Sequence, residues 1–214
     1  DVKHKIASGL KRLLAGDEVF NDFSRRAAAS AARIRQTDLD HLQPPHRKDK
    51  CRFMNIQREI RWAKMVLAHL DRYANSRDEY AELLREKLGW LCEFRDAIEG
   101  WREWVTLIGE TLSLSNQHGV YRGGGLELRR RLDALAVDVA RSDPVRQIVT
   151  SAYAENEAKL HQLPNTVTCL PCSTELLESV FGRYKAMQRH HHRGTFTTLL
   201  AALPTLLHTF TAES

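Results

Sequence analysis

The sequence lacks several features that define particular protein classes. Its 214 residues contain no run of 18 apolar residues, so we expect no membrane-spanning helix. Cysteines number only four, and they form a single CxxC, at Cys169 and Cys172, without the second CxxC that would complete a common zinc site. We therefore expect reduced thiols in a cytoplasmic protein. The chain also starts at Asp1 without an initiator methionine or a leader, so we expect it to continue a longer protein.

Positive charge is concentrated in one part of the chain. The net charge is +5, but residues 25–64 contain eleven lysines and arginines against four acidic residues. Between residues 75 and 115 the balance reverses, to nine acidic residues against five basic ones. This asymmetry is typical of a protein that meets a phosphate backbone with one face, although exposed helices are charged in any protein. The residues of this basic region that we predict to bind DNA are Arg47, Lys48, Lys50, Arg52, Arg58 and Arg61.

Apolar residues recur every three or four positions over much of the chain, which is the pattern of amphipathic helices. The pattern predicts one helix from Val2 to Leu14, with Gly16 as its stop. Asp17 is the expected N-cap of a second helix that runs to about residue 36. Two further stripes cover residues 53–73 and 91–112. Stripes of this length are expected to pack on each other as a bundle.

The second half of the chain is also predicted to be helical. We expect a flexible loop at residues 116–125, where three glycines follow one another, and helices at residues 126–140 and 144–163, the latter opening at Pro144. Residues 166–170 are the only stretch typical of a strand, so the predicted fold class is mainly α with little or no strand. Four tryptophans are expected to pack between helices rather than to stack on bases: Trp62, Trp90, Trp101 and Trp104.

A helix predicted over residues 173–189 has one polar edge and one apolar edge. At about 100° per residue, Glu178, Gly182 and Lys185 lie close together on the polar edge. The glycine leaves room for a bulky group beside the backbone, the carboxylate is a ligand for a metal ion, and the lysine suits a phosphate. A solvated helix face is the alternative interpretation.

The first residues of the chain carry a second pair of polar groups. Asp1 precedes a helix and His4 follows one turn inside it, so both side chains can face one site. An aspartate in this position is also a common helix N-cap, and on its own the spacing favours that simpler role.

Together, these two segments resemble the DDE transposases of bacterial insertion sequences. The segment Asp1-Val2-Lys3-His4-Lys5-Ile6-Ala7 is similar to that of the second aspartate, where Asp-x-x-His often occurs. The segment from Ser173 to Lys185 is similar to that of the catalytic glutamate, since Glu178 precedes Lys185 with six residues between them. In the middle, Cys51-Arg52-Phe53-Met54-Asn55 and Arg61-Trp62-Ala63 are similar to part of a long helical insertion. Pro171 and Thr174 stand where a tyrosine and an arginine often precede the glutamate.

The resemblance implies a ribonuclease H-like α/β core that is interrupted by a helical insertion. Residues 1–15 would form a core helix after the second aspartate, and residues 16–164 would form the insertion. Residues 165–214 would return to the catalytic core, with the glutamate helix at 173–189 and a C-terminal helix after it.

The resemblance also implies a chemistry and its partners. Asp1 and Glu178, assisted by His4, would bind two Mg²⁺ or Mn²⁺ ions together with a first aspartate upstream of this chain, and Lys185 would contact DNA. The ions would serve DNA cleavage and strand transfer. Such an enzyme would act on transposon ends and target DNA, as a homo-oligomer in the bacterial cytoplasm at the nucleoid. The isolated chain is expected to be inactive because one carboxylate is missing.

Two other functions stay open from the sequence. A non-catalytic basic helical protein that binds DNA or acts as a scaffold would explain the charge and the helices, with the Asp1 and Glu178 patterns as coincidences. A metal-sensing helical protein could use Cys169, Cys172 and the histidines at 190–192. A transposase is expected to bring Asp1, His4 and Glu178 into one pocket, which a scaffold need not do.

Overall fold

Helices dominate the structure, as the sequence predicts. The computed structural model describes residues 1–46 and 56–171, and these residues are mainly α-helical. The α-helices are α1 (Val2–Ala15), α2 (Glu18–Ile34), α3 (Ile56–Arg72), α4 (Glu79–Leu88), α5 (Arg95–His118), α6 (Gly124–Asp133) and α7 (Val139–His161). Short 3-10 helices occur at η1 (Asp40–Leu42) and η3 (Gly89–Phe94), and strands β1 (Val120–Tyr121) and β2 (Cys169–Leu170) pair antiparallel. Among the helices in these ranges, none combines the length and the hydropathy that a bilayer crossing requires.

Aspartate side chains begin several of the helices. Asp17 accepts a hydrogen bond from the backbone amide of Phe20 at the start of α2, which confirms the predicted N-cap. Asp78 caps α4 in the same way, and Asp138 caps α7. These caps satisfy amides that have no partner inside their own helix, so the helix starts are encoded locally.

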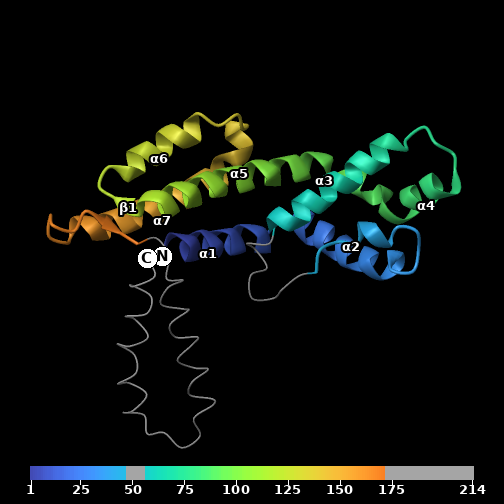
Figure 1. Cartoon of the computed structure of the whole chain (residues 1–214), viewed down its shortest axis with the longest axis horizontal. Helices are drawn as coiled ribbons and strands as arrows, with labels where there is room; N and C mark the ends of the chain where they lie inside the picture. The colour runs from blue at the N-terminus through green and yellow to red at the C-terminus, as the bar shows by residue number, and fades with distance from the viewer. Residues whose placement is uncertain (47–55, 172–214) are drawn as a thin grey trace, which may run out of the picture.

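The long helices lie side by side and share one core. In Figure 1, α1 and α5 run along the length of the molecule, and α1 packs against α7, which packs against α5. Helix α3 packs on α5 farther along, with α2 and α4 beside it. Buried apolar residues form one continuous cluster from Val2 to Tyr153. Residues 1–15 therefore share their core with the residues predicted to form the helical insertion.

Aromatic rings fill the part of the core between α2, α3, η3 and α5. Phe23 is 1% exposed, and its ring packs against those of four neighbours. We call the aromatic cluster the set Phe20, Phe23, Trp62, Trp90, Phe94 and Trp101. The prediction that the tryptophans pack between helices is confirmed, because Trp62, Trp101 and Trp104 are buried and Trp90 packs within the cluster.

Helix α7 begins earlier than predicted, and Pro144 lies inside it. Asp138 caps the helix, so Pro144 is its sixth residue rather than its first. A proline at this position has no amide hydrogen to continue the helical ladder. The indole nitrogen of Trp104 on α5 donates a hydrogen bond of 2.9 Å to the carbonyl of Arg141 in this part of α7. The prediction was wrong because the strong cap at Asp138 outweighs the preference of proline for a first turn.

The glycine triplet opens a helix rather than forming a flexible loop. Helix α5 extends to His118, and α6 starts at Gly124. The Glu157 carboxylate on α7 accepts hydrogen bonds from the amides of Gly123 (2.5 Å) and Gly125 (3.0 Å). A Cβ atom on Gly124 would lie 2.1 Å from the hydroxyl oxygen of Tyr153. Gly124 and Gly125 are therefore needed for close packing on α7, which composition alone does not reveal.

Candidate metal and DNA-binding site

Asp1 and His4 form a pair at the start of α1. The Asp1 carboxylate caps the helix by accepting a hydrogen bond from the backbone amide of His4, and it lies 2.8 Å from Nδ1 of the His4 ring. The Asp1 side chain is only 9% exposed, whereas that of His4 is 66% exposed. The structure is compatible with both interpretations of this segment. Asp1 is the N-cap of α1, and its carboxylate also lies next to the His4 imidazole, as a shared site would require.

This pair lies at one end of a groove between α1 and α7, which we call the α1–α7 groove. The groove encloses about 530 Å³. Its α1 side is formed by Asp1, His4, Lys5, Ser8, Gly9 and Arg12, and its α7 side by Pro144, Gln147, Ile148, Ser151, Ala152 and Glu155. Sequence reasoning missed the α7 side, since exposed serine and glutamine residues on a helix give no pattern of their own.

Two contacts fix the spacing of the groove walls. Lys5 near the start of α1 donates a hydrogen bond to the Glu155 carboxylate near the end of α7, so the two helices run antiparallel. That hydrogen bond is the main cause that lowers the pKa of the Glu155 carboxyl, and the positive charges of Lys5, Lys159 and Arg12 act in the same direction. Gly9 contacts Ile148, and a Cβ atom on Gly9 would lie 2.6 Å from Cγ2 of that isoleucine. A glycine at position 9 therefore allows α1 to approach α7 closely.

The Asp1 carboxylate fits one part of a metal site but not the whole of it. Carboxylate oxygens are the ligands that Mg²⁺ prefers. Within residues 1–46 and 56–171, however, no group of three His, Cys, Asp or Glu side chains has the arrangement of a metal site. A complete site would need carboxylates from elsewhere. The predicted metal ligand Glu178 and the predicted DNA contact Lys185 lie outside the described residues, as do the helices predicted after residue 172.

The last described residues lie on the same side of the molecule as the N-terminus. The antiparallel packing of α1 on α7 brings the close of α7 to the start of α1. Strand β2 follows α7, pairs with β1 and contacts α7 again. In Figure 1 the N-terminus, β1 and the end of α7 all lie towards the left of the view. The helices between residues 16 and 161 therefore return the chain towards Asp1.

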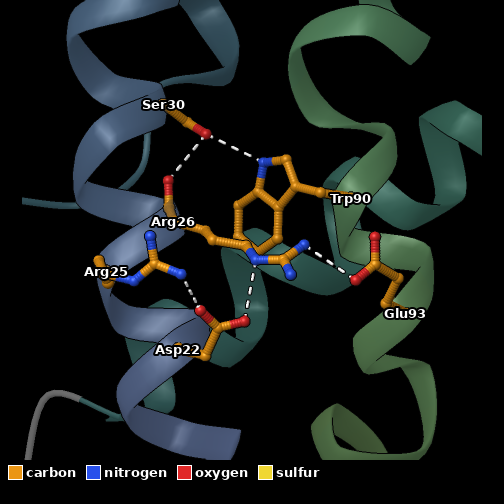
Figure 2. A network of polar contacts seen from close by, with 6 residues as sticks. All are labelled: Asp22, Arg25, Arg26, Ser30, Trp90 and Glu93. Atoms are coloured by element: carbon orange, nitrogen blue, oxygen red, sulfur yellow. Dashed lines mark hydrogen bonds and ion pairs between the residues drawn. The ribbon is translucent and has the colours of Figure 1, made fainter.

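The first arginines of the basic region have structural partners. Figure 2 shows the Arg26 guanidinium between the carboxylates of Asp22 and Glu93, each 2.9 Å away. In the same network the Ser30 hydroxyl donates to the Arg26 carbonyl and accepts a hydrogen bond from the Trp90 indole. Arg26 also lies over the Phe94 ring, 5.4 Å from its centroid. This arginine joins α2 to η3 and is not available to a phosphate.

Two of the arginines predicted to bind DNA are described, and both are exposed. Arg58 and Arg61 lie one turn apart on the solvent face of α3, and neither forms an ion pair or hydrogen bond within the described part of the chain. Arg72 lies on the same face about three turns beyond Arg61. The other predicted contacts, Arg47, Lys48, Lys50 and Arg52, lie outside the described residues.

The cysteine pair is only half described. Cys169 is exposed in β2 with a free thiol, while Cys172 and the histidines at 190–192 lie outside the described residues. The zinc or metal-sensing interpretation therefore stays a prediction.

No family model, curated protein or solved structure matches the chain.

Proposed function

We propose that this chain is the catalytic-glutamate-bearing part of a DDE-type DNA transposase. The observation that carries the proposal is the occurrence of two patterns in one chain, Asp1-x-x-His4 and Glu178 followed after six residues by Lys185. Either pattern alone has a simple structural explanation. Their combination in this order, around a helical unit, is what the DDE transposases of insertion sequences have.

The geometry around Asp1 supports this assignment. A metal-binding carboxylate has to be held in place and also be accessible from a cavity. The His4 ring and amide hold the Asp1 carboxylate from one side, and that carboxylate lines the α1–α7 groove. His4 is thus a positioning residue for Asp1. In this proposal Asp1 and Glu178 would hold the divalent ions, and the ions would activate the attacking hydroxyl and stabilise the leaving oxygen.

The course of the helices is a second support. Asp1 and Glu178 are separated by 176 residues, so a shared site requires the intervening chain to fold back. The described part does so, since β2 follows α7 at the end of the molecule where α1 starts. Only a short stretch of chain separates Leu170 from Glu178.

The exposed arginines of α3 support DNA as the partner. A phosphate backbone is bound by cations that are free of protein carboxylates, because a guanidinium can then form paired hydrogen bonds with it. Arg58 and Arg61 meet this condition, whereas Arg26 does not. We propose that the α3 face contacts the backbone of a transposon end within a homo-oligomer at the bacterial nucleoid.

Metal binding by the chain is the direct test. We expect Mn²⁺ to bind, with affinity reduced at least tenfold or so in both Asp1→Asn and Glu178→Ala. Asparagine is as good a helix cap as aspartate, so Asp1→Asn leaves α1 intact. Glu175→Ala, which removes a carboxylate three residues before Glu178, is the matched control and should retain binding. The signal of free Mn²⁺ in electron paramagnetic resonance measures the bound fraction.

The activity belongs to the intact protein that carries this chain. There, Glu178→Ala should abolish Mg²⁺-dependent cleavage of transposon ends and leave DNA affinity nearly unchanged. Retained cleavage would remove Glu178 from the mechanism. A chain that binds DNA but shows no difference in Mn²⁺ affinity between Glu178→Ala and Glu175→Ala would instead be a non-catalytic DNA-binding protein.

A further inference from the structure

We propose that the α1–α7 groove binds the sugar–phosphate backbone of a DNA strand, with the Arg12 guanidinium on a phosphate. The inference rests on the proposed function and deepens it, because it assigns the path of the strand next to Asp1. The arginines of α3 lie on another element, so the two contacts are separate.

The groove has the direction that such a path requires. His4, Ser8 and Arg12 follow one another at intervals of four residues and so lie on one face of α1. At about 1.5 Å per residue, Arg12 lies roughly 16 Å along the helix from Asp1. This distance corresponds to about five nucleotides at the rise of about 3.4 Å per nucleotide along duplex DNA. A strand held by Arg12 can therefore extend to Asp1 within the groove.

The charges of the groove leave Arg12 as its available cation. Lys5 is paired with Glu155 across the groove, and Asp1 is paired with His4. Arg12 is exposed and forms no hydrogen bond within the described residues, although its charge acts on Glu155 through space. A guanidinium in this state can bind a phosphate through two parallel hydrogen bonds.

Neutral hydrogen-bonding groups line the walls between the two ends. The hydroxyl groups of Ser8 and Ser151 are on exposed residues of opposite walls. Gln147 donates one amide hydrogen to Asp143 at 2.7 Å, which fixes its side chain and leaves the second hydrogen to donate. Such groups contact phosphate and sugar oxygens in protein–DNA complexes without reading sequence. They favour a polar, extended ligand over an apolar one.

The carboxylate of Asp1 gives the groove a dependence on divalent ions. Asp1 lines one end of the groove and repels a polyanion unless a cation neutralises it, whereas Glu155 at the same end already has Lys5 as its partner. We therefore expect the groove to bind DNA more tightly in Ca²⁺, which does not usually support cleavage, than in EDTA.

Arg12 and its neighbour Lys11 provide a matched pair of variants. Both are exposed residues of α1, and both lose one positive charge on substitution by glutamine, but only Arg12 lines the groove. The probe is a fluorescein-labelled single-stranded oligonucleotide about 20 nucleotides long, and its anisotropy is measured with the full chain in Ca²⁺. We expect Arg12→Gln to weaken binding roughly tenfold, the effect of one charge-assisted contact, and to lower the salt dependence by about 0.7. Lys11→Gln should change affinity less than about twofold.

A second pair of substitutions tests the walls without changing charge. Ser8→Ala combined with Ser151→Ala should weaken binding a few-fold, because each hydroxyl contributes one neutral hydrogen bond. Circular dichroism of each variant checks that its total helix content equals that of the parent chain. Equal losses in Arg12→Gln and Lys11→Gln, or no binding of the oligonucleotide by the chain, would overturn the groove assignment. The Mn²⁺ comparison of Glu178→Ala with Glu175→Ala is unaffected by that outcome, so the transposase proposal would stand or fall separately.

Discussion

The aromatic cluster and the α1–α7 groove each have an arginine beside them, and the two arginines differ in their partners. In the cluster Phe23 is buried, and next to the cluster Arg26 is held between two carboxylates. In the groove, the helices meet through Gly9 and Ile148, and Arg12 is left exposed above them. The buried side chains of the cluster therefore stabilise the fold, whereas polar side chains of the groove remain exposed to solvent. An arginine is informative about binding only when its partners are known.

The largest expected effect is on the aromatic cluster. Phe23→Ala should lower the free energy of unfolding by about 3–5 kcal/mol, because it leaves a cavity among four aromatic rings. Urea denaturation followed by tryptophan fluorescence measures the loss. Val19→Ala, at a residue of α2 that is 49% exposed, is the control and should cost well under 1 kcal/mol or so. A loss at Phe23 no larger than that at Val19 would break the assignment of stability to the cluster.

A smaller effect is expected where the groove walls touch. Gly9→Ala should cost about 1–3 kcal/mol, because the added Cβ atom would lie 2.6 Å from a branched carbon of Ile148 and would push α1 from α7. The same substitution at Gly16 meets nothing within 4 Å and serves as the control. Gly16→Ala should be neutral or slightly stabilising, since it restricts the unfolded chain. Equal unfolding free energies for the two variants would show that the walls are not in close contact.

The smallest effect is expected at the ion pair that crosses the groove. Hydrogen bonding from Lys5 lowers the pKa of the Glu155 carboxyl in the folded protein. A lowered pKa stabilises the fold above the unfolded value of about 4.3, and the stabilisation is lost as the pH falls through the lower folded pKa. Glu155→Gln should therefore be slightly less stable than the parent chain near neutral pH, and the difference should disappear in acid, once the pH lies below the lowered pKa of Glu155. Thermal unfolding at neutral and at acidic pH makes the comparison, and a difference that persists in acid would contradict it.

The sequence predicts the local features of this fold better than the long-range ones. The start of α2 follows from Asp17, and the burial of Trp101 follows from the apolar stripe to which it belongs, because caps and periodicity act within a few residues. The split of one predicted stripe into η3 and α5 was not foreseen, since the stripe continues through both. Periodicity reports which residues are buried and not where the hydrogen-bond pattern changes.

The candidate site was predictable only in part for the same physical reason. Asp1 and His4 are one turn apart, so their meeting at 2.8 Å follows from helix geometry. The α7 wall depends on the antiparallel packing of residues 150 positions away, which is seen in the Lys5–Glu155 contact. Arg26 and Arg58 also look alike in sequence, and only the fold separates the structural arginine from the exposed one.

The proline within α7 gives the molecule a built-in place for local opening. The turn that precedes Pro144 is held by the Asp138 cap and by the Trp104 indole rather than by an unbroken ladder of backbone hydrogen bonds. Loss of these few contacts would release that turn while the rest of α7 stays folded. Its amide hydrogens are therefore expected to exchange with solvent sooner than those near Tyr153, which lies in the core. Pro144 also lines the groove, at the end opposite Asp1. Fluctuations of this turn therefore change the shape of that end of the groove and leave the Asp1 end unchanged.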